Sequence, residues 1–176
     1  LPISGTNGKT TTASIIYSIL TQAGIKTAQL GTLGMIADGF EQNATLTTPD
    51  AISLQKTFSE LRDADFSHIV MEVSSHALDQ YRVADVDFNV AVFTNLTPEH
   101  LDYHATLESY YQAKAKLFRM LPLESTAIVN GSDSNGLRMA EETNAPTLTF
   151  SRSNETSIHY NDLTISISGI SGKISA

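Results

Sequence analysis

The sequence contains no cysteine among its 176 residues. A disulfide framework and a thiolate metal site are therefore both excluded, and the composition suits a reducing compartment, so we expect a cytoplasmic location. Basic residues are also scarce, since 11 Lys and Arg stand against 19 Asp and Glu, which gives a net charge of −8. Because binding to a nucleic-acid backbone needs clustered Lys and Arg, we expect no nucleic-acid partner.

Long hydrophobic runs are missing as well. No apolar stretch approaches the roughly 18–20 residues that span a bilayer, so we expect no membrane insertion, and no basic segment followed by an apolar run indicates a secretion signal. The 41% of hydrophobic residues still suffice for one domain with a substantial core. Residues 1–4 resemble the end of a strand, and no closing helix precedes Ala176, so we expect a fragment truncated at both ends.

Apolar residues recur at helical spacing in several segments. Helices are predicted over residues 10–23, where Gly24 suits the left-handed position after the last turn, and over residues 106–120 and 137–143. Asp50 is a favourable N-cap for another helix. In the first helix the residues at helical spacing are Ile15, Ile16, Ile19, Leu20 and Ala23. The helix after Asp50 is expected to carry Ile52, Leu54, Phe58 and Leu61 on its buried side.

Strands are predicted between these helices. Residues 68–71 and 89–93 are continuous apolar runs, typical of strands covered on both faces, and shorter strands are expected at 26–30, 127–129 and 147–150. Residues 35–40 indicate a hairpin with an Asp-Gly turn. The alternation predicts a three-layer α/β domain of the P-loop type with a mostly parallel sheet. After residue 150 apolar and polar residues alternate (Ile158, Tyr160, Leu163, Ile165, Ile167), which predicts a small antiparallel addition.

A glycine-rich loop lies between the first strand and the first helix, at residues 5–10 (GTNGKT). Glycines allow successive N–H groups to point inward, and the helix start adds a partial positive charge, so the loop is expected to bind phosphates. Lys9 would reach the β- and γ-phosphates, and the Thr10 hydroxyl would ligate Mg²⁺. The general P-loop pattern has a glycine where this chain has Ile3. The alternative is a glycine-rich turn without function.

Acidic and imidazole side chains follow two of the predicted strands. Glu72 comes directly after residues 68–71, and the loop after residue 93 packs two histidines and two acids into six residues, Glu99 to His104. Ligands bind at the carboxyl edge of open α/β sheets, where a carboxylate can hold Mg²⁺. The alternatives are a solvated strand-end glutamate and surface histidines.

Lys114 occupies an unusual position on the helix over residues 106–120. It shares one helical face with Tyr110, Leu117 and Leu121, where a hydrophobic residue is expected. A buried lysine loses its charge readily and becomes nucleophilic. The alternative is a lysine whose stem packs while its ammonium stays in water.

Four segments together resemble the central, ATP-binding domain of the Mur ligases. They are residues 5–12 (GTNGKTTT), 47–50 (TTPD), 71–83 (MEVSSHALDQYRV) and 93–118 (FTNLTPEHLDYHATLESYYQAKAKLF). Within the family they are most similar to the ligases that add the third amino acid to the peptidoglycan precursor UDP-MurNAc-L-Ala-D-Glu. Several separate motifs in the right order make the resemblance specific as far as about Phe118. From about Pro122 to Ala176 the resemblance is only generic.

The resemblance implies roles for individual residues. Catalytic roles fall on Lys9, Glu72, His100 and Lys114. The ATP phosphates would be bound by Gly5, Thr6, Asn7, Gly8, Lys9, Thr10 and Thr11. Thr10 and Glu72 would hold one Mg²⁺, His100 would lie near a second, and Lys114 would react with CO₂ to give a carbamate that helps to place it. The UDP-MurNAc-dipeptide would contact Thr47, Thr48, Ser74, Gln80 and Arg82, where Arg82 suits a substrate carboxylate.

The implied activity is ATP-dependent amide formation by a monomer, through an acyl phosphate. Family members commonly have asparagine where this chain has Leu46, which affects one substrate contact. We expect the family's N-terminal uridine-nucleotide domain and C-terminal domain to be missing from these 176 residues, so the incoming amino acid stays open between diaminopimelate and lysine. Two alternatives remain. One is a related ligase of the folylpolyglutamate synthase or cyanophycin synthetase type, and the other is a fragment that only binds nucleotide or is inert.

Overall fold

The computed structural model describes residues 1–43, 45–153, 155–166 and 169–176. Its strands are β1 (Pro2–Ser4), β2 (Thr27–Gly31), β3 (Gly34–Ala37), β4 (Phe40–Gln42), β5 (His68–Glu72), β6 (Val90–Phe93), β7 (Thr126–Asn130), β8 (Thr147–Ser151), β9 (Ile158–Ser166) and β10 (Gly169–Ser175). In the described part of the chain they form one sheet in the order β10-β9-β8-β7-β6-β1-β5-β2-β3-β4. All pairs from β2 through β9 in this order are parallel, and the sheet ends in antiparallel strands on both sides.

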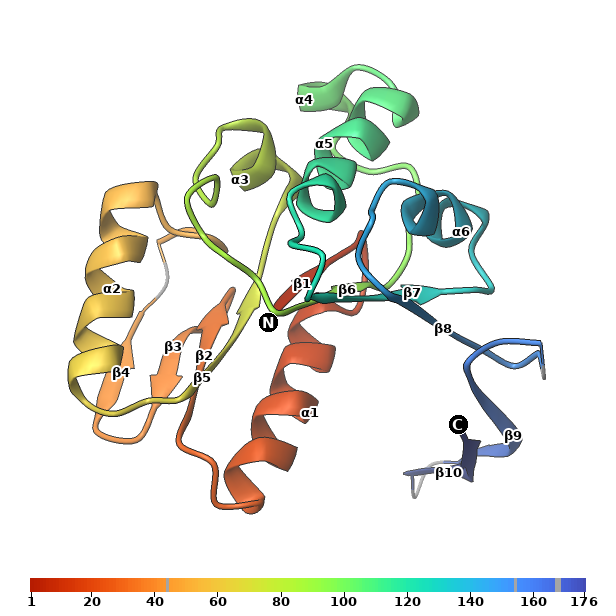
Figure 1. The fold of residues 1–176 in the computed structure, drawn as a ribbon, viewed down its shortest axis with the longest axis horizontal. Helices are drawn as coiled ribbons and strands as arrows, with labels where there is room; N and C mark the ends of the chain where they lie inside the picture. Colours follow the sequence, from red (N-terminus) through yellow and green to blue (C-terminus); the bar gives the residue numbers. More distant parts are fainter. Residues whose placement is uncertain (44, 154, 167–168) are drawn as a thin grey trace.

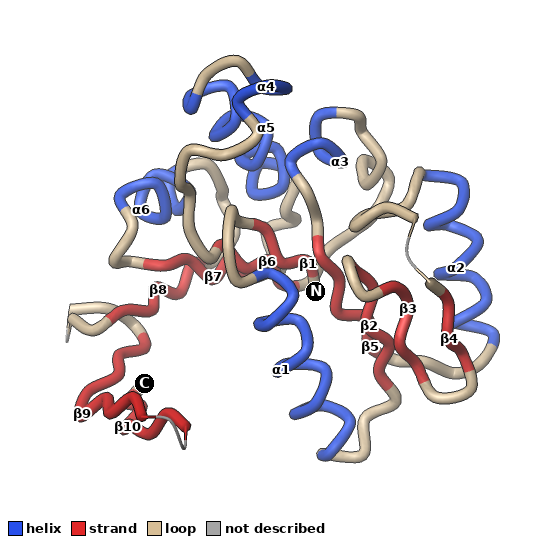
Figure 2. Tube along the Cα trace, turned by 180° about the vertical axis from the view of Figure 1, so that it is seen from behind, coloured by secondary structure: helices blue, strands red, loops and turns tan. Residues whose placement is uncertain are grey.

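The helices lie on both faces of this sheet (Figures 1 and 2). They are α1 (Lys9–Gln22), α2 (Ala51–Asp63), α3 (Ser75–Asp79), α4 (Leu101–His104), α5 (Leu107–Arg119) and α6 (Ser134–Glu141). Figures 1 and 2 agree that α1 lies on one side of the sheet and that α3, α5 and α6 lie on the other. The three-layer α/β architecture predicted from the alternation of elements is therefore confirmed.

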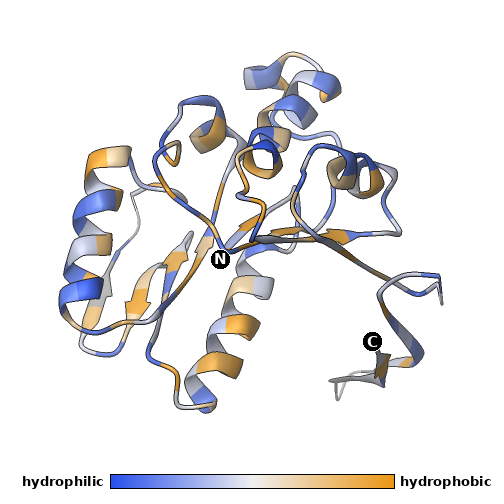
Figure 3. Cartoon of the chain, in the orientation of Figure 1, coloured by the Kyte–Doolittle hydropathy of each residue, from blue (hydrophilic) through white to orange (hydrophobic). Residues whose placement is uncertain are grey.

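Two hydrophobic clusters fill the spaces between the sheet and the helices on its two faces. Val70 and Val92 point toward α1, where they pack with Ile3 and Ala13. Their chain neighbours belong to the larger cluster on the other face, which includes Met71, Phe93, Leu54, Leu61, Leu117, Phe118 and Met139. Because successive strand residues face opposite sides of a sheet, a strand buried on both faces must be apolar throughout. Figure 3 shows this hydrophobic colouring along β2, β3 and β7, whereas α2 alternates between hydrophilic and hydrophobic.

The bounds of the predicted helices are confirmed to within three residues, the largest shift being that of α6, which begins at Ser134 and not at Leu137. The first predicted helix begins at Lys9, and Gly24 follows it with φ 78°. The Asp50 side chain accepts hydrogen bonds from the N–H groups of Ile52 and Ser53, so it caps α2 as predicted. One core residue of α2 was predicted wrongly, since Ile52 is 84% exposed while Leu54 is fully buried. Two residues correspond to about 200° around a helix, which turns Ile52 away from the face that carries Leu54.

The hairpin at residues 35–40 is confirmed as β3 and β4, with Asp38 and Gly39 between them. The antiparallel addition is confirmed as the pair β9 and β10. The prediction did not include the parallel register of β9 with β8, which continues the main sheet. Of the alternating positions, Ile167 lies outside the described residues. The short helices α3 and α4 were not predicted, because five and four residues are too few to show a helical period.

No helix in the described part of the chain is long and apolar enough to cross a bilayer.

Candidate active site

The strands β1, β5 and β6 are adjacent and parallel, and the segments that follow their carboxyl ends line a cavity of about 450 Å³. Each of these strands leads into a segment that carries predicted site residues: the glycine-rich loop after β1, residues 73 and 74 after Glu72, and the histidine loop after β6. The cavity is lined by Thr6, Asn7, Gly8, Lys9, Thr10, Thr11, Thr32, Leu46, Thr47, Glu72, Ser74, His76, Arg82 and His100. The predicted gathering of the glycine-rich loop, Glu72 and the histidine loop at one sheet edge is therefore confirmed.

The glycine-rich loop depends on backbone conformations that favour glycine. Gly5 has φ 151°, and a Cβ there would overlap the Thr94 hydroxyl. Gly8, with φ 84°, is the N-cap of α1. The Lys9 ammonium is folded back on the loop and donates to the carbonyls of Gly5 (3.0 Å) and Thr6 (2.8 Å). Burial lowers the pKa of Lys9, although the nearby carboxylates of Glu72 and Glu99 oppose this shift.

Glu72 is the last residue of β5, and its side chain is buried with 1% exposure. Its carboxylate accepts hydrogen bonds from the Thr10 hydroxyl (2.9 Å), the Thr32 N–H (2.9 Å) and the Thr32 hydroxyl (3.2 Å). Gly31 leaves the necessary space, because a Cβ at that position would overlap the carboxyl group. The alternative of a solvated strand-end glutamate is therefore excluded.

Lys114 lies directly beneath the glycine-rich loop. Its side chain is 1% exposed, and its ammonium donates to the Gly5 carbonyl at 2.9 Å and lies 4.5 Å from the centre of the Tyr110 ring. Burial, together with the positive charge of Lys9, lowers the pKa of Lys114 to about 7. The alternative of a lysine with its ammonium in water is thus excluded. The chain instead holds a buried amine next to the phosphate loop.

The two predicted histidines differ in exposure. His100 is exposed at the cavity wall and has a left-handed backbone with φ 55°, whereas His104 is 7% exposed and its Nε2 is 2.9 Å from the Ser75 hydroxyl. A third imidazole, His76, lies between them, with ring centres 5.2 Å from His100 and 5.5 Å from His104. Burial is the main cause that lowers the pKa of His76 and of His104.

The residues expected to bind the UDP-MurNAc-dipeptide fall into two groups. Thr47, Ser74 and Arg82 line the cavity directly. Thr48 is fully buried, and its hydroxyl donates to the Glu72 carbonyl (3.0 Å) and accepts from the Ser74 N–H (3.1 Å). Thr48 therefore fixes the backbone conformation of residues 72–74 and with it the position of Ser74.

Arg82 is held at the mouth of the cavity by two acceptors. Its Nη1 donates to the Thr48 carbonyl at 2.8 Å, and its Nε donates to the Gln80 side-chain oxygen at 3.0 Å. Gln80 is exposed and is not among the described residues that line the cavity. In this structure Gln80 orients the guanidinium group of Arg82.

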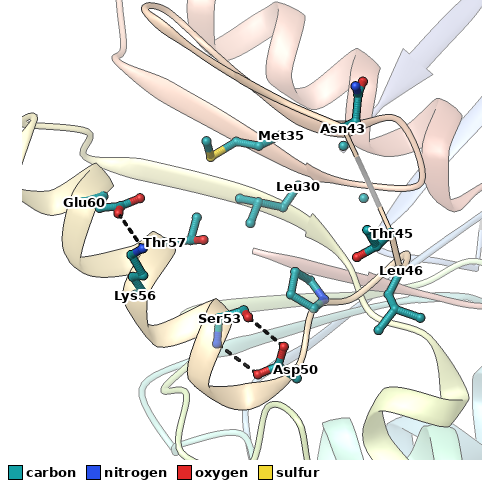
Figure 4. Close-up of a pocket in the computed structure, with 13 residues that line it drawn as sticks. Leu30, Met35, Asn43, Thr45, Leu46, Asp50, Ser53, Lys56, Thr57 and Glu60 are labelled. Carbon is teal, nitrogen blue, oxygen red and sulfur yellow. Dashed lines mark hydrogen bonds and ion pairs between the residues drawn. The ribbon is translucent and has the colours of Figure 1, made fainter.

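A second cavity of about 230 Å³ adjoins the first (Figure 4). It lies between α2 and the strands β2 and β3, and Leu46 and the neighbouring Thr45 stand at its edge. Leu46 lines both cavities and is 46% exposed.

Thr32 and His76, which line the cavity, were not predicted as site residues. Thr32 binds Glu72 and also lies 3.2 Å from the Thr47 hydroxyl, measured between the two oxygens. Thr32 follows β2 at the same carboxyl edge, so the rule that located Glu72 applies to it as well. His76 stands inside a motif that carries the family resemblance, but its lone imidazole gave no separate signal.

The oxygen atoms around Glu72 suit a Mg²⁺ ion. No group of three or more His, Asp or Glu side chains able to hold a metal occurs among residues that the structure describes. Mg²⁺ does not require such a group, because it commonly uses one or two carboxylates and completes its shell with water and phosphate oxygens. The buried Glu72 carboxylate with the Thr10 hydroxyl on it provides this type of donor set.

Comparisons with known proteins agree with this geometry. The family description "Mur ligase middle domain" matches residues 3–175. The UDP-N-acetylmuramoyl-L-alanyl-D-glutamate–2,6-diaminopimelate ligase of Geobacter metallireducens is 42% identical over 178 residues, covering 98% of this chain and 35% of the relative. The chain therefore spans about a third of the length of the curated relatives that it matches.

Solved structures give the same picture. A structure of a UDP-N-acetylmuramoyl-L-alanyl-D-glutamate–2,6-diaminopimelate ligase superposes with a TM-score of 0.87 at 31% identity, covering 98% of this chain and 36% of that one. The folylpolyglutamate synthase of Mycobacterium tuberculosis, complexed with ADP and AMPPCP, has a TM-score of 0.74 at 16% identity, over 99% of this chain and 47% of that one, and so shares the fold. Fold, site geometry and sequence together show that the chain belongs to the Mur ligase family, as its middle domain.

Proposed function

We propose that this domain serves an ATP-dependent ligase that adds diaminopimelate to UDP-MurNAc-L-Ala-D-Glu, acting as a monomer in the cytoplasm. The observation that carries the proposal is the convergence of Lys9, Glu72, His100 and the buried amine of Lys114 around the glycine-rich loop. The choice of diaminopimelate is supported by the names of the relatives at 41–42% identity over nearly the whole chain.

The reaction joins two anions before it forms the amide. The D-Glu side-chain carboxylate of the precursor attacks the γ-phosphorus of ATP, so that ADP leaves and an acyl phosphate forms. The amino group of diaminopimelate then attacks the acyl carbon, loses a proton, and phosphate leaves. Such chemistry depends on positioning and on neutralisation of negative charge more than on covalent groups of the protein.

The glycine-rich loop and Lys9 would neutralise the triphosphate. The Lys9 ammonium must leave the carbonyls of Gly5 and Thr6 to reach the phosphates, and both bonds are short local contacts along the loop. The N-terminal N–H groups of α1 have no partners within the helix and would bind phosphate oxygens. Residues 5–11 would thus form the ATP phosphate site.

Mg²⁺ would be held by Glu72 and Thr10, with His100 near a second ion, and when bound it would neutralise charge on the phosphates. Thr32 keeps the Glu72 carboxylate oriented through two hydrogen bonds, one from its N–H and one from its hydroxyl. A carboxylate that is already fixed loses little conformational entropy when it binds an ion.

Lys114 would react with CO₂ to form a carbamate that helps to place the second ion. Only the neutral amine is nucleophilic, and a pKa of about 7 makes a large fraction of Lys114 neutral near neutral pH. Its position under Gly5 would bring the new anion close to the phosphate loop.

The precursor would approach along the side of the cavity formed by Thr47, Ser74 and Arg82. Arg82 can offer a bidentate pair of N–H donors to a substrate carboxylate. We assign Thr48 and Gln80 to the support of this wall, through their bonds to Ser74 and Arg82.

ADP release by the full-length protein tests the proposal. We expect release to require both UDP-MurNAc-L-Ala-D-Glu and diaminopimelate, and to fall at least ~100-fold in Lys9→Ala, which loses its cation at the phosphates. Lysine in place of diaminopimelate should support much slower release. Release that depends on a folate and glutamate, without the muramyl precursor, would favour the folylpolyglutamate synthase alternative instead.

A further inference from the structure

A segment outside the glycine-rich loop fixes the conformation of that loop. Asn95 follows β6, and its side-chain amide binds both polar groups of Asn7. Its Oδ1 accepts from the Asn7 N–H at 2.9 Å, and its Nδ2 donates to the Asn7 carbonyl at 3.1 Å. One side chain therefore holds the N–H and the C=O of the same loop residue, which restrains both backbone torsions of Asn7.

The neighbours of Asn95 add further bonds to the loop. The Thr94 hydroxyl donates to the Asn7 carbonyl at 2.7 Å, and the Thr6 N–H donates to the Asn95 carbonyl at 2.8 Å. The Thr97 N–H donates to the Thr6 hydroxyl at 3.0 Å. Residues 94–97 therefore run along the glycine-rich loop and bind it at two successive residues.

This segment is anchored from behind, independently of the loop. The Leu96 N–H donates to the Asp133 carboxylate at 2.8 Å, and the Asn130 side chain donates to the Thr94 carbonyl at 2.9 Å. Asp133 is also the N-cap of α6. Three residues beyond Thr97 the same segment reaches His100, at the wall of the cavity.

We infer that Asn95 is a positioning residue that sets the phosphate loop and couples it to His100. The inference rests on the proposed function for its substrates. Because the Asn7 N–H donates to Asn95, this N–H is not available to phosphate oxygens, and Asn7 contributes to the loop through its fixed backbone conformation. Loss of the Asn95 side chain would release the Asn7 N–H and leave the Asn7 carbonyl with the Thr94 hydroxyl, so residue 7 would be less restrained and the nucleotide would have to complete the ordering of the loop. The free energy needed to order the loop would then be subtracted from the binding free energy, so ATP would bind more weakly.

Two variants of the full-length protein test the coupling. Asn95→Ala removes both bonds, whereas Asn95→Asp keeps the acceptor for the Asn7 N–H but sets a carboxylate oxygen against the Asn7 carbonyl. We expect the KM for ATP to rise about tenfold in the first and further in the second, as two hydrogen bonds predict. The KM for diaminopimelate should change less than twofold, and the Mg²⁺ concentration for half-maximal rate should rise with the KM for ATP.

Controls separate positioning from general damage. Asn161→Asp makes the same chemical change on exposed β9 and should leave both KM values and the Tm unchanged. An Asn95 variant with a lowered Tm, a lower kcat and an unchanged KM for ATP would reduce Asn95 to a structural residue and overturn the inference. A KM for ATP within twofold of wild type in both variants would overturn it too.

A binding measurement keeps this test apart from the proposed function. Calorimetric titration with ATP·Mg²⁺ requires no turnover, and we expect about tenfold weaker binding by Asn95→Ala. If wild type binds ATP but shows no release dependent on the precursor, the proposed function fails while the titration still decides the role of Asn95. Equal affinities of wild type and both variants would reject the role of Asn95 alone.

Discussion

Lys114 is a buried side chain whose charged form is disfavoured by its surroundings. Lys114 is only 1% exposed, and its ammonium donates to one carbonyl, that of Gly5. The positive charge of Lys9 is nearby. The free-energy penalty of burying the charged ammonium therefore exceeds the stabilisation that this hydrogen bond provides. Burial and the charge of Lys9 therefore lower the pKa to about 7, and the neutral amine, which avoids the cost of burying a charge, is the form that can react with CO₂.

The variant Lys114→Ala tests the carbamate directly. Without the carbamate the second ion loses a ligand, so we expect the ligation rate in the full-length protein to fall at least ~100-fold. Added acetate or propionate should restore a measurable part of the rate, because a short carboxylate fits the vacated space and carries the same charge. A wild-type rate without any additive would remove the carbamate from the mechanism.

The pKa of Lys114 also predicts how its carbamate depends on pH. Above the pKa the amine is neutral and reactive, and below it the amine is protonated and inert. At a fixed concentration of dissolved ¹³CO₂ we therefore expect a carbamate signal in ¹³C NMR that declines as the pH falls through about 7. Lys114→Met should lack the signal. A signal that appears only above pH ~10 would indicate an ordinary exposed lysine.

At the residue scale, the sequence allowed the groups at strand ends and on helix faces to be predicted. Glu72 followed from its place after an apolar strand and Lys114 from its helical face, and both are buried at the predicted edge. The bonds of Thr48 to Glu72 and of Asn95 to Asn7 join residues 24 and 88 positions apart. Such pairs depend on how loops approach one another in the folded chain, and no local pattern encodes that approach.

At the scale of elements, the starts of α1, α2 and α5 were predicted to within one residue because their signals are local, whereas α6 begins at Ser134, three residues before the predicted start. The Asp50 side chain accepts hydrogen bonds from two N–H groups at the start of α2. At the start of α5 the Thr106 hydroxyl accepts a hydrogen bond from the Ser109 N–H. The buried face of α2 was predicted less well. Ile52 was assigned to the core by its hydrophobicity, although its angular position places it opposite Leu54.

A pair of substitutions in α2 tests that assignment. Leu54→Ala empties a fully buried site and should lower the free energy of unfolding by about 2–5 kcal/mol. Ile52→Ala removes a side chain that is 84% exposed and should change it by no more than about 0.5 kcal/mol. Chemical denaturation of both variants under the same conditions gives the comparison. Equal losses would mean that Ile52 is covered in solution.

At the scale of the whole molecule, the fold explains why the site lies where it does. The three strands β5, β1 and β6 are adjacent and parallel, so the segments that follow them must meet at one edge. The order of the strands was not predictable from the sequence, because the central β1 comes first in the chain and its neighbours come fifth and sixth. The chain spans about a third of its relatives, and we expect no ligation by these 176 residues alone.

The most direct test of the account is the position of the metal ions around bound nucleotide. Crystals of the full-length protein with a non-hydrolysable ATP analogue and Mn²⁺ would show the ions by their anomalous scattering. We predict one ion bound by Glu72 and Thr10 and a second near His100 and the modified Lys114, with the phosphates on residues 5–11. Phosphates and ions bound elsewhere on the domain, with Lys9 still on the carbonyls of Gly5 and Thr6, would contradict the account.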